Sequence, residues 1–295
     1  MKLCRCWAIL NIYLWASLLL VSSCKDAYIH NYKLIPQAPH QAESITLPEL
    51  YETSIIEKIL YLEKTAGYKL DTSAIKLLQN WRCNMQLQNF SIDPNESRLT
   101  KKNKLKWLGS MLTDSSLLIQ EYHSSMTTCL NYRIFDCDIL SMLYTDLATG
   151  VGVSLNTILL PQHIVVLYRD YRDTIVWETT KNRETNFHKL YNQYAIPDNQ
   201  WMYPNYDQLV LVGLYNIAKD KSDKNSFELP IVLLEKNITL WPAWQNPYRL
   251  LGHCYYKIDN CEDAIRNYQT YLSHNPWHIQ AQLELNDILL EHQPH

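Results

Sequence analysis

The spacing of apolar residues changes between residues 137 and 178 from that of a helix to that of two strands, and this change constrains the fold most strongly. After residue 137, apolar side chains recur at helical spacing, and Gly150 marks the expected end of the helix. Two apolar runs, 164–168 and 174–178, then flank a polar turn at 169–173, which predicts an antiparallel hairpin. The sequence therefore predicts a mixed α+β fold.

A cysteine, a histidine and a carboxylate lie at the ends of these predicted elements. Asp136 is placed to cap the helix, which puts Cys137 in its first turn, where free N–H groups and the helix dipole favour the thiolate. His163 begins the first strand and Glu178 ends the second, so the hairpin brings both near one end. A cysteine nucleophile needs a base, and the base needs a third group to orient it. Cys137, His163 and Glu178 are therefore the candidate catalytic residues.

Three short motifs around these residues resemble one superfamily. Asp136-Cys137-Asp138 precedes a helix, Leu160-Pro161-Gln162-His163 precedes a strand, and Trp177-Glu178-Thr179-Thr180 closes the hairpin. Their order is similar to that in the transglutaminase-like cysteine peptidase superfamily, in a bacterial branch that commonly carries tetratricopeptide repeats after the catalytic-type domain. The likeness covers roughly residues 45–295.

The resemblance implies a papain-like transglutaminase core, with helices packed on an antiparallel sheet, followed by an all-α tetratricopeptide-like segment. It implies Cys137 as nucleophile, His163 as base and acyl transfer at amide bonds of a peptide or protein substrate, by hydrolysis or by transfer to an amine, without a cofactor. The acid is usually aspartate across the superfamily, so Glu178 departs from that pattern, although the branch itself often shows this Trp-Glu-Thr-Thr piece.

Each candidate residue also has a structural explanation. Cys137 fits a small buried apolar residue, His163 a strand-end histidine bound to a carbonyl, and Glu178 an exposed strand residue. His188 is a weaker candidate for the base because it follows the hairpin on a short predicted helix, 186–194. Many members of the superfamily are non-catalytic. The alternative function is therefore an envelope scaffold that binds peptide or protein partners through the same core and the repeats.

The N-terminus predicts export. A short basic start precedes an apolar run from Trp7 to Val21, which has the length of a signal-peptide core rather than of a membrane span. Val21-Ser22-Ser23-Cys24 resembles a bacterial lipobox, so the sequence predicts a signal peptide at 1–23 and a lipid on Cys24, with 24–45 as a tether. The predicted location is the cell envelope, on the periplasmic face of the outer membrane. Ordinary secretion and an uncleaved anchor are the alternatives.

Export changes what the cysteines imply. Of eight cysteines, five remain in the folded part, and an odd number in an oxidising compartment indicates one free thiol. The hypothesis that follows pairs Cys83 with Cys129 and Cys254 with Cys261, and leaves Cys137 unpaired. No cysteine pair has zinc-ligand spacing with histidines, so we expect no metal site.

A repeat occupies the C-terminal part. Pro242 lies 34 residues before Pro276, which is the tetratricopeptide period, and small and aromatic residues between them fall at the offsets of that repeat. The expected division is a transglutaminase-like domain at 46–208 and repeats at 209–295, closed by a solvating cap helix at 279–292. The repeats either bind a protein partner in a groove or only support the preceding domain.

The remaining composition excludes some functions and predicts helices. The charge is nearly balanced, at −3, and no basic stripe indicates binding to nucleic acid. The six glycines are too few to predict a glycine-rich loop that holds a phosphate. Helical spacing extends over most of residues 47–130. Within it, helices are expected over 72–81 and 104–120, and a break at 89–97 rich in turn formers separates them.

Overall fold

The computed structural model describes residues 54–113, 118–119, 125–161, 163–194 and 201–291. The predicted signal peptide, the lipid site at Cys24 and the tether lie outside these residues. Within the described chain, none of the helices has the length and apolar character needed to cross a membrane.

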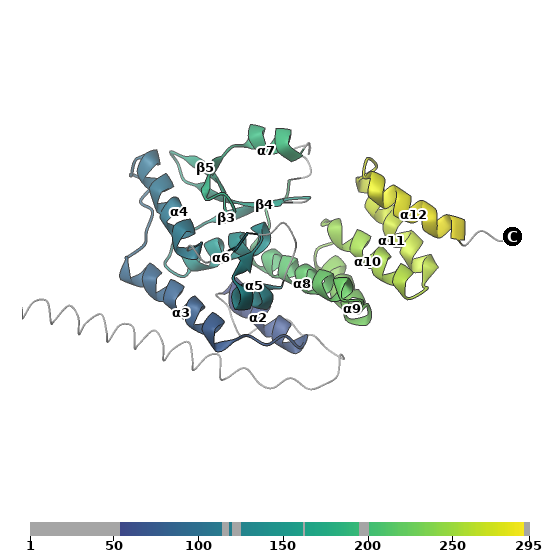
Figure 1. The fold of residues 1–295 in the computed structure, drawn as a ribbon. Helices are drawn as coiled ribbons and strands as arrows, with labels where there is room; N and C mark the ends of the chain where they lie inside the picture. Colours follow the sequence, from purple (N-terminus) through teal and green to yellow (C-terminus); the bar gives the residue numbers. More distant parts are fainter. Residues whose placement is uncertain (1–53, 114–117, 120–124, 162, 195–200, 292–295) are drawn as a thin grey trace, which may run out of the picture.

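Helices surround a small antiparallel sheet, which confirms the α+β prediction (Figure 1). The described helices are α2 (Ile55–Thr65), α3 (Thr72–Leu87), α4 (Arg98–Leu112), α5 (Met126–Tyr132), α6 (Cys137–Thr149), α7 (Phe187–Tyr194), α8 (Tyr206–Asp223), α9 (Glu228–Leu240), α10 (Asn246–Lys257), α11 (Cys261–His274) and α12 (Ile279–Glu291). The described strands are β1 (Leu118–Ile119), β2 (Ile134–Phe135), β3 (Asn156–Leu160), β4 (His163–Arg169), β5 (Thr174–Glu178) and β6 (Arg183–Thr185).

The main sheet has the order β3-β4-β5-β6, and all its neighbouring strands are antiparallel. Leu160 pairs with His163, so the chain turns from β3 into β4 within two residues. The predicted hairpin is confirmed: Arg169 pairs with Thr174 across the polar turn. The short strands β1 and β2 pair parallel to each other outside this sheet.

The two faces of the sheet pack against different helices. Ile164, Val166 and Trp177 belong to the large apolar core that includes α6. The alternate residues Val165 and Val176 pack with Leu190 of α7 in a smaller cluster. In Figure 1, α7 accordingly lies on the side of the sheet opposite α6. Every side chain of α6 from residue 138 to 148 is buried, so this helix is enclosed on all sides.

The helices before α6 follow the predicted pattern with shifted bounds, except that the helix expected over 104–120 ends at Leu112 and residues 118–119 form β1 instead. The break at 89–97 is confirmed, but α4 begins at Arg98 rather than at 104, because the Ser97 hydroxyl caps the helix by accepting from the Thr100 amide at 3.1 Å. Likewise α3 continues beyond the expected residue 81 to Leu87. Apolar spacing located these helices, whereas the caps set their ends.

A buried lysine joins α4 to the hairpin. The Lys101 side chain is fully buried, and its Nζ lies 2.7 Å from both Asp170 Oδ2 and Asp173 Oδ2 in the turn between β4 and β5. It also donates to the Pro94 carbonyl at 2.8 Å. Because each of its protons has an acceptor, the buried charge is compensated and fixes the turn against α4.

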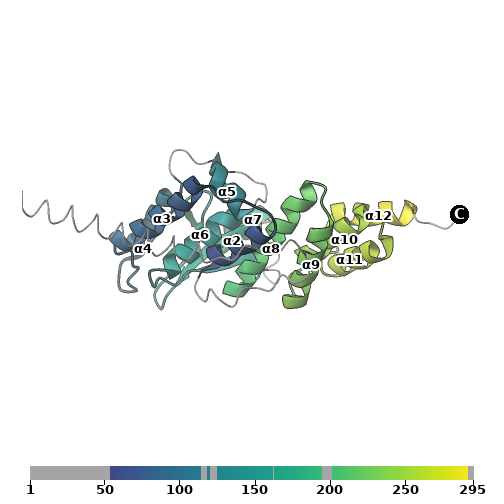
Figure 2. The same cartoon turned by 90° about the horizontal axis from the view of Figure 1, so that it is seen from below.

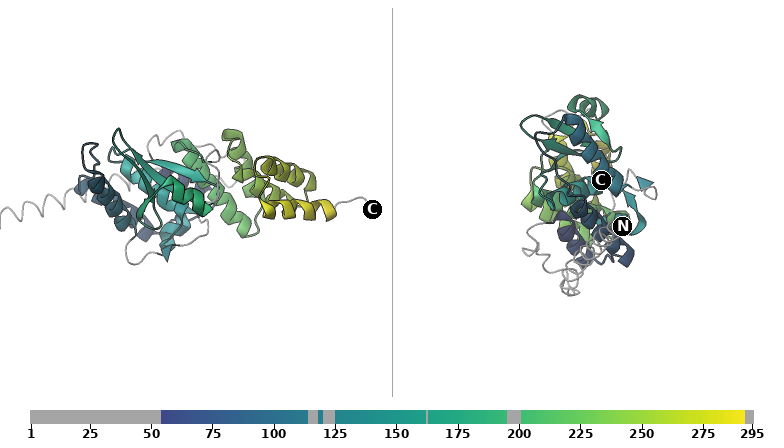
Figure 3. Two further views of the ribbon diagram at one scale, coloured as in Figure 1. Left: turned by 90° about the horizontal axis from the view of Figure 1, so that it is seen from above. Right: turned by 90° about the vertical axis from the view of Figure 1, so that its left-hand side faces the viewer.

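The C-terminal helices form successive antiparallel pairs that extend away from the sheet (Figures 2 and 3). The first pair is α8 and α9, which are joined by residues 224–227. The position of the last predicted helix is confirmed as α12, which exposes polar side chains such as Gln282 and Asp287 but also apolar ones. Ile279, Leu283 and Leu290 are 69%, 52% and 67% exposed, so α12 presents apolar side chains to solvent.

Helix α8 packs directly on α2, and a glycine sets their separation. A Cβ at Gly213 would lie 2.6 Å from Cδ1 and Cγ1 of Ile59. Gly213 therefore permits the close approach that carries the core from the first helix into the C-terminal helices.

We predict that Gly213→Ala lowers the free energy of unfolding by about 1–3 kcal/mol, because the added methyl overpacks the α2–α8 contact. An ordinary helix-interior glycine gains about 0.5–1 kcal/mol on the same change. Chemical denaturation measures the difference. The control is Gly150→Ala, whose Cβ would make only ordinary contacts at 3.5 Å. In an Ile59→Ala background the loss should shrink; equal losses in both backgrounds would contradict the assigned contact.

Candidate functional site

The start of α6 places Cys137 as predicted from the sequence. Asp136 is the N-cap, and its Oδ1 accepts from the Ile139 amide at 2.9 Å. Cys137 is the first residue of the helix, and Gly150 caps its end. Capping by a short acidic side chain therefore fixes where the helix begins, and with it the position of the thiol.

The hairpin brings His163 and Glu178 into contact. His163 Nε2 lies 2.7 Å from Glu178 Oε2, and the two residues are only 9% and 3% exposed. The other carboxylate oxygen, Oε1, accepts from the Thr180 hydroxyl at 2.9 Å. The β4–β5 register explains the contact, because extending it sets His163 opposite Thr180, with Glu178 diagonally across on the same face. Since Nε2 faces the carboxylate, Nδ1 is the nitrogen that can act on a thiol.

Helix α6 meets β4 beside the histidine. Ser141, one turn after Cys137, donates to the Ile164 carbonyl at 3.4 Å and lies 3.1 Å from the Thr179 hydroxyl. These contacts join the first turns of α6 to the residues that follow His163 and Glu178. Ser141, Thr179 and Thr180 were not among the predicted site residues, although the two threonines belong to the motif that contains Glu178.

The sheet geometry separates the two halves of the candidate site. By strand alternation His163 and Glu178 lie on the face that carries the α7 cluster, whereas Cys137 packs against the core on the α6 face. The β4–β5 ladder extends only from Val166 to Arg169 on β4, so it stops short of His163. The Cys137 thiol lies near the backbone of Ile164, the residue after His163, so the two halves lie near the same end of β4.

The environment of Cys137 favours the thiol. Burial is the main cause that raises its pKa well above the ordinary value, and the charges of Asp138 and Asp136 raise it further. Hydrogen bonding from the Ile164 backbone lowers the pKa but does not offset these causes. The thiol lies 3.4 Å from Asp138 Oδ1. The expectation that the helix start favours a thiolate is therefore wrong in this structure, because burial, together with the two flanking carboxylates, outweighs the helix dipole.

Glu178 has the opposite shift. Burial raises its pKa, but the hydrogen bonds from His163 and Thr180, together with the His163 charge, bring it below the ordinary value. The carboxylate is therefore ionised at neutral pH and positioned to stabilise an imidazolium.

The remaining candidates lie elsewhere. His188 is exposed on α7, where its Nδ1 is 3.2 Å from Asn192 Nδ2. No disulfide joins the described cysteines to one another, so the pairing of Cys83 with Cys129 and of Cys254 with Cys261 is wrong in this structure. The Cys254 thiol faces Ser222 Oγ at 3.8 Å instead. Among the described residues, no group of three or more His, Cys, Asp or Glu side chains could hold a metal ion.

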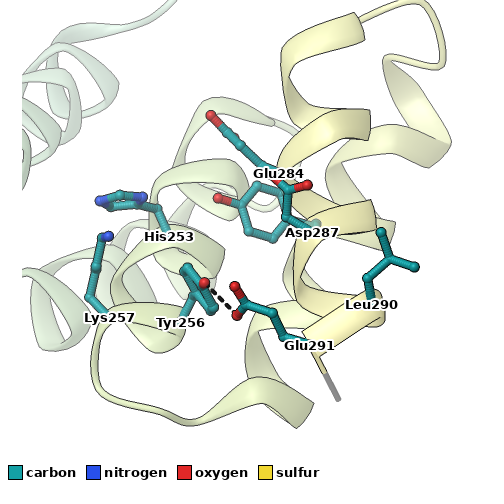
Figure 4. Close-up of a pocket in the computed structure, with 8 residues that line it drawn as sticks. His253, Tyr256, Lys257, Glu284, Asp287, Leu290 and Glu291 are labelled. Atoms are coloured by element: carbon teal, nitrogen blue, oxygen red, sulfur yellow. Dashed lines mark hydrogen bonds between the residues drawn. The ribbon is translucent and has the colours of Figure 1, made fainter. Parts of the chain in front are cut away.

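Two cavities lined by described residues lie away from Cys137. One, of about 480 Å³, lies between β5, β6 and α7 and includes Arg98, Glu184 and Phe187. The other, of about 380 Å³, lies between α10 and α12 (Figure 4). Three carboxylates of α12 line this second cavity, together with His253, Tyr256, Lys257, Tyr268 and Leu290. The Tyr256 hydroxyl donates to Glu291 at 2.7 Å.

Comparisons with known proteins place the chain in no family. No protein-family model matches it, and no curated protein sequence matches it. Among solved structures it is similar to menin, in a crystal structure described as revealing the binding site for Mixed Lineage Leukemia (MLL) protein. The identity is 12% and the TM-score 0.40, over 68% of this chain and 60% of the menin chain. The chain thus spans less than two thirds of menin, and the similarity is too low to support a shared fold.

We predict that Asp138→Asn lowers the pKa of Cys137, because it removes a charge that disfavours the thiolate. The thiolate is the form that alkylates, and below the pKa its fraction rises about tenfold for each unit by which the pKa falls. Iodoacetamide labelling of Cys137, followed by mass spectrometry, should therefore be faster at pH 8 in the variant. Asp138→Glu, which keeps the charge, is the control. Equal rates for the Asn and Glu variants would contradict this electrostatic assignment.

We also predict a loss of acid sensitivity in Glu178→Gln. Because the folded-state pKa of Glu178 is lowered, its contribution to stability is present above the unfolded pKa, near 4.5, and is lost as the pH falls through the folded value. Urea unfolding between pH 3 and 7 should show a flatter acid limb in the variant than in the wild type. Parallel pH profiles would show that Glu178 is not held as a carboxylate.

Proposed function

We propose that the chain is a transglutaminase-like acyl-transfer protein in which Cys137, His163 and Glu178 act on amide bonds. The observation that carries this proposal is the buried 2.7 Å hydrogen bond between His163 and Glu178. A carboxylate in that position fixes the imidazole tautomer and stabilises the imidazolium that forms when the histidine accepts a proton. The site needs no cofactor.

The chemistry starts from a neutral thiol. As the Cys137 sulfur attacks an amide carbonyl, its proton passes to His163 Nδ1, and Glu178 stabilises the resulting imidazolium. His163 then returns this proton to the leaving amine, and an acyl-cysteine remains. Water or a second amine resolves that thioester, which gives hydrolysis or transamidation. Backbone N–H groups near Cys137 supply part of the oxyanion hole that stabilises the charge formed during attack.

The proposed setting is the bacterial cell envelope. Removal of residues 1–23 and lipidation of Cys24 would anchor the chain at the periplasmic face of the outer membrane, with residues 24–45 as tether. The substrate is then an envelope peptide or protein. The helices from residue 209 onward are the proposed tetratricopeptide-like segment.

Labelling with a peptide acyloxymethyl ketone tests the catalytic proposal. The wild type should label at Cys137, and Cys137→Ala should lose that adduct. His163→Gln should slow labelling by about 10²- to 10⁴-fold, the contribution expected of a positioned base. Cys261, a partly exposed thiol on α11, serves as an internal reference. Labelling of Cys137 at the rate of Cys261, unchanged by His163→Gln, would contradict a catalytic site.

The raised pKa of Cys137 favours a second candidate function, a non-catalytic envelope scaffold. In this function partners bind through the core and the repeats, and the cavity between α10 and α12 is one place where the repeats offer a binding surface (Figure 4). The thiolate fraction distinguishes the two functions. If a bound peptide leaves the pH dependence of Cys137 alkylation unchanged, the scaffold is favoured; if the bound peptide shifts it to lower pH, catalysis is favoured.

A further inference from the structure

The turn that carries the candidate base is tied to the C-terminal helices. Asn246, the first residue of α10, donates from its Nδ2 to the Pro161 carbonyl at 3.0 Å. Pro161 lies in the two-residue turn between Leu160 and His163. This contact joins positions 85 apart in the sequence and lies two residues before the imidazole.

The backbone on both sides of the turn restricts its movement. Leu159 exchanges two backbone hydrogen bonds with Met202, at 2.8 and 2.9 Å, which fixes the free edge of β3. On β4 the ladder to β5 does not reach His163, so this strand end has less support from the sheet itself. Asn246 therefore restrains the chain next to His163, where β4 no longer forms hydrogen bonds with β5.

An aromatic cluster holds Asn246 in place. Trp244, two residues earlier, is 4% exposed and packs against Tyr215 of α8 and against Trp241, with ring centroids 5.1 and 5.2 Å apart. Burial is the main cause that raises the pKa of Tyr215, and the charge of Asp138, the neighbour of Cys137, raises this pKa further. The same group of C-terminal residues thus borders both the cysteine-bearing helix and the histidine-bearing turn.

We propose that Asn246 is a positioning residue that sets the place of His163 relative to Cys137 through its hydrogen bond to the Pro161 carbonyl. This inference rests on the proposed acyl-transfer function. If it is correct, the C-terminal helices help to set the position of the histidine. This position matters because a misplacement of about 1 Å in a catalytic group can lower the rate about 10²-fold.

Asn246→Asp is the informative variant. It keeps the size of the side chain, removes the donor and sets a carboxylate oxygen against the Pro161 carbonyl. Because acidic residues are favourable at a helix N-terminus, the change should leave α10 intact. The control is Gln245→Ala at the preceding residue, whose Nε2 donates to the Ala243 carbonyl at 3.0 Å rather than to the turn. Thermal unfolding and circular dichroism check that both variants fold.

Two measurements test the proposal: the labelling rate of Cys137 by a peptide acyloxymethyl ketone, and the ring ¹⁵N shifts of His163, assigned by their loss in His163→Gln. Asn246→Asp should slow labelling about 10- to 10²-fold and change the ring shifts, and Gln245→Ala should do neither. If His163→Gln slows labelling but Asn246→Asp changes neither quantity, positioning by Asn246 is wrong and the acyl-transfer site stands. If His163→Gln has no effect on labelling, the proposed function fails. The ¹⁵N shifts of the His163 ring, measured in Asn246→Asp, then test positioning on their own: a change supports it and unchanged shifts contradict it.

Discussion

The enclosure of α6 is the constraint on which the rest of the structure depends. Because the helix is buried along its length, its polar side chains need partners from every surrounding element. Asp146 accepts from Ser54 at 3.1 Å and lies 3.5 Å from Arg82, which joins the N-cap of α2 and the C-terminal half of α3 to the helix. Tyr144 accepts from Trp177 at 3.2 Å, which joins it to the sheet. These contacts fix the position of α6, and therefore of the thiol at its start.

The candidate site follows from this arrangement in two parts. One part, His163 with Glu178, is set by the register of the hairpin and by Thr180. The other, Cys137, is set by the Asp136 cap and by contacts between α6 and β4. The two parts belong to different faces of the sheet, and we propose that the turn at Pro161, bound by Asn246, sets the distance between them. This is why a residue as remote as Asn246 bears on the proposed chemistry.

The sequence predicted the elements of the site better than their electrostatics. The N-cap, the helix and the two strands depend on local spacing, and all three were located correctly from it. The pKa of Cys137 depends on burial and on the net effect of Asp136 and Asp138 against the helix dipole, which no sequence pattern gives. The disulfide pairing was wrong because parity of cysteines does not specify which thiols meet. The exposed apolar side chains of α12 were not predicted. The repeat pattern predicted where this helix lies in the sequence, whereas the exposure of its side chains depends on whether another element packs against its outer face.

Rapid-quench detection of an acyl-cysteine tests the central claim most directly. The chain is mixed with a p-nitrophenyl ester, quenched in acid and mapped by mass spectrometry. We predict an adduct on Cys137 that forms about 10²-fold or more faster in the wild type than in His163→Gln, as general-base assistance requires. An adduct on Cys137 that forms at the same rate in both proteins, or no faster than on Cys261, would contradict it.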